Sequence, residues 1–325
     1  MGLAEKNLLD IQSYIDFLEQ NNHLIRVKSE VDPVHEMAGI AKKFEGGKAM
    51  LFENVKGHDY PVFLGLYWNR DMMARFFDTD SAQLPFVLAD GIKEWRQHPM
   101  EPVIVKQGPA NEVIKTTPDL TKLPIPHHAE GDGGRYLTSS VVIAKDPDTG
   151  VRNLSIHRMM LTGTNRMTLL LEELGHLMDY YKRAEAKGVP LEITVNNGVD
   201  FPVCMAGAVP ASAAPIGMDE LGIASQLRGA PVELLESQTV GVEGIANAQF
   251  IIEGRILPQV REEEGPYAEV TGYYAEREAR WVVEATAVTR REQPIFHSIL
   301  SVKEVADAYG IIAGAGAFEQ AHSMV

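Results

Sequence analysis

The stretch Arg261-Glu262-Glu263-Glu264-Gly265-Pro266-Tyr267-Ala268-Glu269-Val270-Thr271-Gly272-Tyr273-Tyr274 carries two carboxylates, Glu264 and Glu269, on either side of a Gly-Pro pair. Residues at an odd spacing on an unbroken strand point to opposite faces. Both carboxylates enter one cavity only if the chain turns between them, and Gly265-Pro266 supplies a turn because of the backbone preferences of the two residues. Two carboxylates in one pocket resist ionising together, so one can carry a proton near neutral pH. The spacing indicates an acid/base pair, although an exposed acidic corner at Glu262 to Glu264 would explain the same residues.

This stretch resembles the signature of the UbiD family of decarboxylases, a Glu-Gly-Pro-aromatic-small-acid-x-Thr-Gly-Tyr-Tyr segment. Upstream blocks are similar to further segments of the family, in the same order: Asn153-Leu154-Ser155-Ile156-His157-Arg158, Gly175-His176, Gly217-Met218-Asp219-Glu220 and Leu227-Arg228-Gly229. The resemblance extends over about residues 115–300. It implies a non-oxidative, reversible decarboxylase of an aromatic or α,β-unsaturated carboxylic acid that uses prenylated FMN.

The resemblance also implies roles for single residues. Glu269 would donate the proton that replaces CO2, and Glu264 and Arg158 would complete the catalytic network. An amide oxygen, an imidazole and a carboxylate suit manganese or magnesium and leave positions open for phosphate and water. The metal ligands would be Asn153, His176 and Glu220, with potassium as a further candidate nearby. The cofactor contacts would come from Asn153, Ser155, Ile156, His157, Arg158, Gly175, His176 and Glu220.

Length and composition limit the function. At 325 residues the chain exceeds the size at which one hydrophobic core keeps growing, so two domains are expected. The hydrophobic content of 45% and the charged content of 23% are ordinary for a globular protein. A net charge of -15 argues against binding to nucleic acid or anionic membranes. It also repels a carboxylate substrate at long range, which would therefore need a local cation such as Arg158 or a metal.

The single cysteine, Cys204, excludes an intramolecular disulfide and a cysteine-rich zinc cluster. It lies in an apolar run, residues 202–206, which predicts a buried and inert thiol. Residues 1–6 lack the charged-then-apolar pattern of a signal peptide, and no apolar run approaches the roughly 18 residues of a membrane span. We expect a cytoplasmic protein.

Residues 1–115 alternate between helical and β patterns, which predicts a small N-terminal α/β domain. Within residues 8–21, an apolar residue recurs at helical spacing at Ile11, Tyr14, Ile15 and Leu18. The other expected elements are helices at 34–43, 70–77 and 85–97 and strands at 24–27, 49–52, 61–67 and 112–115. A proline-punctuated connector at 117–126 follows and suits a domain boundary.

Residues 116–300 are dominated by strand patterns and predict a split β-barrel wrapped by a few helices, so the fold class is α/β (α+β). The expected strands are 138–144, 151–160, 190–195, 232–236, 250–257, 281–290 and 295–299. The first two flank a turn and predict a hairpin. Asn153 and Arg158 differ by an odd number of positions, so either a bulge brings them together or they reach different ends of a long cofactor. A helical stretch closed by Gly188 is expected directly after His176, and residues 127–134 are interpreted as a glycine-rich surface loop.

Residues 301–325 are interpreted as the start of a truncated or divergent C-terminal region, because the family normally continues much further. The chain would then form a homo-oligomer or bind a partner subunit that supplies the remaining part. An apolar patch around residues 299–317 would be exposed. An alternative function is a non-catalytic flavin-binding or structural subunit of a larger decarboxylase or carboxylase assembly.

Overall fold

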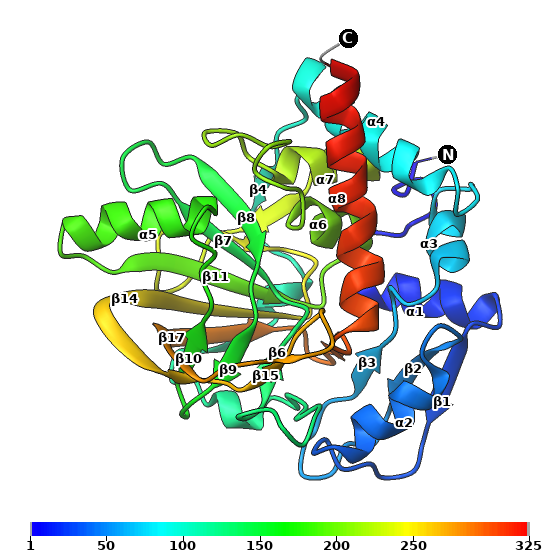
Figure 1. The fold of residues 1–325 in the computed structure, drawn as a ribbon, viewed down its shortest axis with the longest axis horizontal. Coiled ribbons are helices and arrows are strands. Elements are labelled where there is room, and N and C mark those ends of the chain that lie inside the picture. Colours follow the sequence, from blue (N-terminus) through cyan, green and yellow to red (C-terminus); the bar gives the residue numbers. More distant parts are fainter. Residues whose placement is uncertain (1, 324–325) are drawn as a thin grey trace.

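The computed structural model describes residues 2–323, apart from the side chains of residues 307–309 and 320–323. Within this range the N-terminal part contains α1 (Ile11–Gln20), α2 (Glu36–Phe44), α3 (Arg70–Phe76) and α4 (Leu84–Gln97). Its sheet has the order β1-β2-β3-β18, formed by β1 (Leu24–Val27), β2 (Ala49–Phe52), β3 (Val62–Leu64) and β18 (Phe296–His297). Because β18 comes from far along the chain, the end of the second part completes the N-terminal sheet (Figure 1).

Helix α1 forms for the reason that its sequence indicates. The Asp10 side chain accepts the backbone N–H of Ser13, and the Ser13 hydroxyl closes a reciprocal cap. The predicted apolar stripe of Ile11, Tyr14, Ile15 and Leu18 is buried in the core. The prediction of this helix is therefore confirmed.

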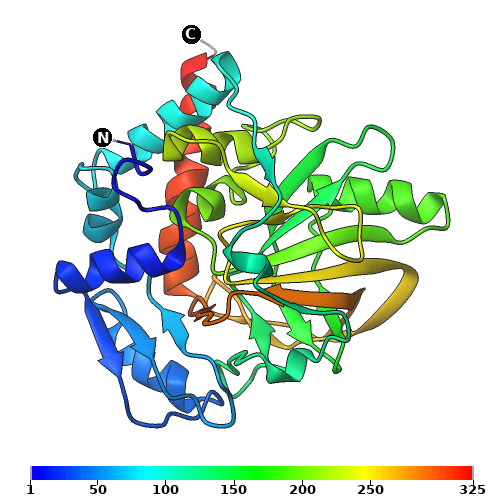
Figure 2. The same cartoon turned by 180° about the vertical axis from the view of Figure 1, so that it is seen from behind.

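The second part is built on a curled antiparallel sheet with the order β6-β9-β10-β17-β14-β11-β7-β8 and with β5 paired to β17 (Figures 1 and 2). Its strands are β5 (Val113–Lys115), β6 (Tyr136–Leu137), β7 (Val141–Lys145), β8 (Arg152–Ile156), β9 (Met159–Leu161), β10 (Arg166–Leu169), β11 (Leu191–Asn197), β14 (Phe250–Glu264) and β17 (Glu278–Arg290). This curled half-barrel beside a small α/β part confirms the predicted fold class. Where the division at residue 115 falls stays a prediction.

Shorter elements complete the described chain. A second small sheet contains β4 (Val103–Val105), β12 (Glu233–Leu235) and β13 (Gly244–Ile245), and a hairpin contains β15 (Tyr267–Ala268) and β16 (Tyr274–Ala275). The remaining helices are η1 (Pro109–Asn111), η2 (Leu120–Lys122), α5 (His176–Ala186), α6 (Phe201–Ala206), α7 (Leu221–Arg228) and α8 (Lys303–Ser323). Cys204 is buried on α6, as predicted.

The predicted hairpin is present, but its second strand is shorter than expected. β7 and β8 pair in antiparallel register, and β8 ends at Ile156 instead of running on to Met160. The chain resumes as β9, which pairs with β6 and β10. Since β8 and β9 lie toward opposite ends of the sheet order, His157 and Arg158 cross the gap where the curled sheet does not close. Because of this crossing, the side chains of Asn153 and Arg158 point to different parts of the protein, toward Glu220 and Glu264.

Helix α8 packs against α4 and α6 (Figure 1). Ile299, Leu300, Ile311 and Ile312 are all buried, so the predicted exposed patch at residues 299–317 is wrong for these four side chains. The side chain of Tyr309 lies outside the described residues. An exposed edge-to-face pair of rings, Phe86 and Phe318, lies next to it instead. Residues 324 and 325 of the predicted C-terminal region lie outside the described residues. No helix in the described part of the chain is long and apolar enough to cross a membrane.

Candidate active site

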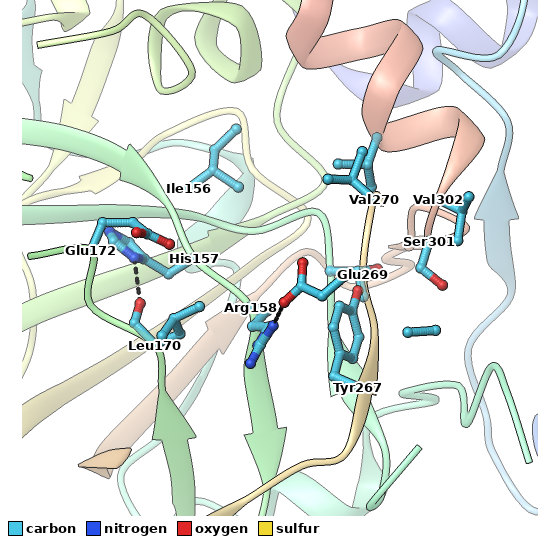
Figure 3. Close-up of a pocket in the computed structure, with 13 residues that line it drawn as sticks. Ile156, His157, Arg158, Leu170, Glu172, Tyr267, Glu269, Val270, Ser301 and Val302 are labelled. Atoms are coloured by element: carbon cyan, nitrogen blue, oxygen red, sulfur yellow. Dashed lines mark hydrogen bonds and ion pairs between the residues drawn. The ribbon is translucent and has the colours of Figure 1, made fainter. Parts of the chain in front are cut away.

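A pocket of about 230 Å³ lies where the β8–β9 crossing faces the hairpin β15–β16 and the start of α8 (Figure 3). Its lining is mainly apolar, with a few polar groups: Thr138, Ile156, His157, Arg158, Leu170, Glu172, Tyr267, Ala268, Glu269, Val270, Ser301, Val302 and Val305. Small-molecule sites usually measure ~300–1,000 Å³. The pocket is therefore smaller than the usual site for a drug-sized ligand.

Arg158 joins the two carboxylates of the signature stretch. Its Nε and Nη2 atoms each donate to Glu264, at 3.1 Å, in a bidentate pair. Its Nη1 atom donates to Glu269 (Figure 3). The chain turns between the carboxylates, as expected, because β14 ends at Glu264 and β15 begins at Tyr267. The alternative of an exposed acidic corner is wrong for Glu264, whose exposed fraction is 1%.

The two carboxylates have different surroundings. Glu264 also accepts the Tyr136 hydroxyl at 2.8 Å, and Arg280 lies 3.5 Å from it. Glu269 lies in the turn between β15 and β16, and 33% of its side chain is exposed. Glu264 is therefore held by several groups, whereas Glu269 has one cation as its partner here and has room to move.

Aromatic rings shield the cation. The Arg158 guanidinium lies over the Tyr267 ring, 4.8 Å from its centroid, and Tyr267 packs against Tyr136. Burial, with the negative charge of Glu264 close by, raises the pKa of Tyr136 far above its ordinary value. Burial also raises the pKa of Tyr267. Both phenols therefore stay protonated at neutral pH, and the Tyr136 hydroxyl keeps the proton that it donates to Glu264.

The predicted metal ligands also come together, on the other side of the crossing. Glu220 is buried just before α7, and its Oε1 atom lies 3.0 Å from Asn153 Nδ2 and 3.4 Å from His176 Nδ1. The other oxygen accepts the backbone N–H of Leu154 at 2.9 Å. In the described part of the chain, no group of three or more His, Cys, Asp and Glu suited to a metal is found. The set here is two such side chains and an amide, and its donor chemistry fits Mn²⁺ or Mg²⁺.

A hollow of about 380 Å³ opens beside His176, which begins α5. Gly175, Lys182 and Ala211 are among the residues that line it. A basic side chain and the start of a helix are both favourable neighbours for a phosphate group. Ile156, His157 and Arg158 line the pocket, whereas none of them lines the hollow.

Two supporting features were not found from the sequence. Residues 127–134 are not a plain surface loop, because His128 and Asp132 are buried. Asp132 accepts the backbone N–H of Ala268 at 2.8 Å and so fixes the strand before Glu269. Tyr136 and Arg280, the further partners of Glu264, belong to strands whose patterns gave no sign of a site. An aspartate followed by two glycines at 132–134 was the one available signal of a tight, structured turn.

Comparison with known proteins gives a family match and several similar proteins. Residues 103–304 match the UbiD family, described as the 3-octaprenyl-4-hydroxybenzoate carboxy-lyase Rift-related domain, and residues 15–91 match its N-terminal domain. An uncharacterized protein in the cooM 5' region of Rhodospirillum rubrum is 48% identical over 95% of this chain and 67% of its own length. An anhydromevalonate phosphate decarboxylase of Methanosarcina mazei is 32% identical over 89% of this chain and 64% of its own length.

Among solved structures, an evolved dimeric form of the UbiD-class enzyme HmfF from Pelotomaculum thermopropionicum, in complex with prFMN, is similar to this one. The identity is 40% and the TM-score 0.88, over 93% of this chain and 70% of the solved chain. This chain spans about two thirds of the length of these relatives. The family match covers more than half of the sequence and includes both candidate clusters. The chain therefore belongs to the UbiD family.

Proposed function

We propose that this chain is the cofactor-binding and catalytic part of a non-oxidative, reversible decarboxylase that acts on an aromatic or α,β-unsaturated carboxylic acid. The observation that carries the proposal is Arg158, held between Glu264 and Glu269 at the wall of a largely apolar pocket. An apolar lining with one cation and one partly exposed carboxylate suits a small organic acid.

In the proposed reaction, the substrate carboxylate competes with Glu269 for Arg158 Nη1. Glu264 keeps the guanidinium in place through its bidentate pair, so the cation does not follow Glu269. Released from Arg158, Glu269 takes up a proton. The carbon–carboxylate bond then breaks, CO2 leaves, and Glu269 delivers its proton to the carbon that keeps the electron pair. The reverse reaction needs Glu269 as the base that removes this proton.

Prenylated FMN, when bound, would supply the group that accepts electron density from the breaking bond. The residues proposed to hold its phosphate, through Mn²⁺ or Mg²⁺, are Asn153, His176 and Glu220. Their support is the convergence of an amide, an imidazole and a buried carboxylate beside a hollow with a basic side chain. Gly175, Ser155, Ile156 and His157 are proposed to lie along the cofactor. Potassium and a cytoplasmic location stay predictions from the sequence.

A second candidate is a non-catalytic flavin-binding or structural subunit. What favours a partner is the exposed Phe86–Phe318 ring pair on α4 and α8, since exposed aromatic groups often mark interfaces. A homo-oligomer or a complex with a second subunit would cover it. The dimeric form of the HmfF relative is consistent with the first of these.

Reconstitution with prenylated FMN and Mn²⁺ separates the candidates. We expect the purified protein to gain visible absorbance and to release CO2 from at least one member of a panel of aromatic and α,β-unsaturated acids. If the chain instead binds flavin but releases no CO2, whether it is assayed by itself or together with the proteins that co-purify with it, that result would support the flavin-binding subunit. A chain that binds no flavin would support the structural subunit.

A further inference from the structure

A row of hydrogen bonds leads from the candidate metal site to the pocket. Asn153 Oδ1 lies 3.1 Å from Ser155 Oγ, and Ser155 Oγ lies 2.9 Å from His157 Nε2. His157 Nδ1 lies 2.8 Å from the carbonyl oxygen of Leu170, which lines the pocket (Figure 3). Asn153 and His157 are both buried. Every proton in the row must therefore find an acceptor within it or next to it.

The carbonyl group of Leu170 decides which atom donates and which accepts in each hydrogen bond of the row. A carbonyl oxygen only accepts, so His157 Nδ1 carries a proton and donates it to Leu170. Burial lowers the pKa of His157 to about 4, so the ring is neutral and its Nε2 atom accepts. The donor to Nε2 is the Ser155 hydroxyl. A hydroxyl has one proton, which leaves Ser155 with only acceptor capacity toward Asn153.

The Asn153 amide can present either end to Ser155. In the structure its oxygen faces Ser155 and its nitrogen donates to Glu220. In that orientation Ser155 faces two acceptors, Asn153 Oδ1 and His157 Nε2, with a single proton. A half-turn of the amide exchanges nitrogen and oxygen at almost no steric cost, and the N–H then donates to Ser155. The amide oxygen joins Glu220 Oε1 and His176 Nδ1, and a cation satisfies all three.

We propose that Ser155 and His157 are positioning residues, which hold the amide oxygen of Asn153 toward a divalent metal ion shared with His176 and Glu220. The proposal rests on the proposed function for the metal site itself. It gives Ser155 and His157 a task beyond contact with the cofactor. They fix which end of Asn153 meets the metal, as hydrogen-bond partners of metal ligands commonly do.

Titration of Mn²⁺ alone into the purified chain, without flavin, tests the proposal. Binding is measured by calorimetry and by the electron paramagnetic resonance signal of free Mn²⁺. We expect Ser155→Ala to weaken Mn²⁺ binding by roughly tenfold to hundredfold, the range usual for such partners. Ser155→Thr keeps the hydroxyl and should bind like wild type. Thermal unfolding of each variant shows whether the fold is intact.

The orientation of the amide is tested in an Asn153→Asp background. A carboxylate has oxygen at both ends, so it needs no partner to choose between them. In that background, adding Ser155→Ala should change the Mn²⁺ affinity by less than about twofold. A carboxylate presents an oxygen to the metal whichever way it is held, so the two changes should not be additive. A loss as large as that in the Asn153 protein would overturn the proposal.

The part played by His157 has its own variant. His157→Phe keeps a ring but removes the acceptor, so Ser155 can donate to Asn153 and hold the wrong end toward the metal. Mn²⁺ binding should weaken, and combining this change with Ser155→Ala should add little. Wild-type affinity in Ser155→Ala would overturn this proposal and leave the metal site standing. A wild-type chain that binds no Mn²⁺ would overturn both.

Discussion

Each end of the segment from Asn153 to Arg158 contacts a buried carboxylate, and the two carboxylates have different partners. At the Arg158 end, Glu264 has a bidentate arginine, a tyrosine hydroxyl and a second arginine around it. At the Asn153 end, the partners of Glu220 in the described structure are an amide, a backbone N–H and an imidazole. One carboxylate is paired by the protein's own cations, and the other faces Asn153 and His176, the two side chains proposed to share a metal with it.

The difference in partners suits the Arg158 end to catalysis and the Asn153 end to binding. A buried carboxylate is costly without a compensating charge. The Glu264 cluster supplies that charge itself, so its geometry can be fixed before a ligand arrives. In the proposed function, the Glu220 cluster would obtain it from a bound cation, so its affinity for metal and its geometry would depend on each other. Changes at the Arg158 end should therefore alter turnover, and changes at the Asn153 end should alter binding.

The largest expected effect is on turnover. Glu269→Gln keeps the shape of the side chain but removes the proton, so decarboxylation in the reconstituted protein should fall by roughly 100-fold to 10,000-fold, the contribution of a general acid. Metal and flavin binding should be kept. The measurement is CO2 release together with deuterium incorporation at the product carbon.

The matched control is Glu262→Gln, since Glu262 lies on the same stretch but pairs with Arg166. It should leave turnover near wild type. Glu264→Gln should raise KM more than it lowers kcat, because it loosens Arg158 without removing the acid. If Glu269→Gln decarboxylates at close to the wild-type rate, Glu269 is not the acid, and the two carboxylates have been assigned wrongly.

A second change addresses the other end of the segment. His176→Ala removes one of the proposed ligands and should weaken Mn²⁺ binding by more than about tenfold, since even indirect partners of metal ligands contribute that much. Flavin binding should weaken with it, because a metal and the anion it bridges stabilise one another. Metal content and visible absorbance after gel filtration measure both effects.

His58→Ala is the control for that variant. His58 contacts the Lys122 carbonyl and does not line the pocket or the hollow. It should keep metal and flavin. Wild-type stoichiometry of both ligands in His176→Ala would remove His176 from the metal site and with it the contrast between the two ends.

The smallest effect concerns a third buried carboxylate, Glu304, near the pocket at the start of α8. Its oxygens accept backbone N–H groups of Leu300, at 2.8 Å, and Tyr67, at 3.3 Å. Burial raises its pKa from 4.5 to about 8. The folded state thus holds a proton that the unfolded state releases, and the resulting stability is full below about pH 4.5 and is lost as the pH rises through about 8.

Glu304→Gln cannot lose a proton, so its free energy of unfolding should fall less than that of wild type between pH 5 and pH 8. Each unit of pKa difference corresponds to about 1.4 kcal/mol. Urea unfolding at a series of pH values gives the comparison, with the exposed Glu130→Gln as control. Parallel curves for wild type and Glu304→Gln would mean that Glu304 is already charged in the folded protein at pH 5.

Local chemistry in the sequence determined much of the fold. The capped start and apolar stripe of α1 and the turn at Gly265-Pro266 depend on residues close together in the chain, where propensity and capping act. The signature blocks also indicated which side chains would form the site. Three of them, Arg158, Glu264 and Glu269, do meet in the structure, although their roles stay proposals.

The tertiary structure alone decided how those side chains meet. Strand patterns predicted one continuous strand from 151 to 160, because alternation does not show which neighbour a strand will pair with. The curled sheet places β8 and β9 toward opposite ends of its order, and the chain must cross between them at His157 and Arg158. That crossing turns Asn153 toward Glu220 and Arg158 toward Glu264. Arg280 reaches Glu264 because β17 pairs with β14, and Tyr136 reaches it from β6, at the far end of the sheet order; no local pattern encodes either neighbour.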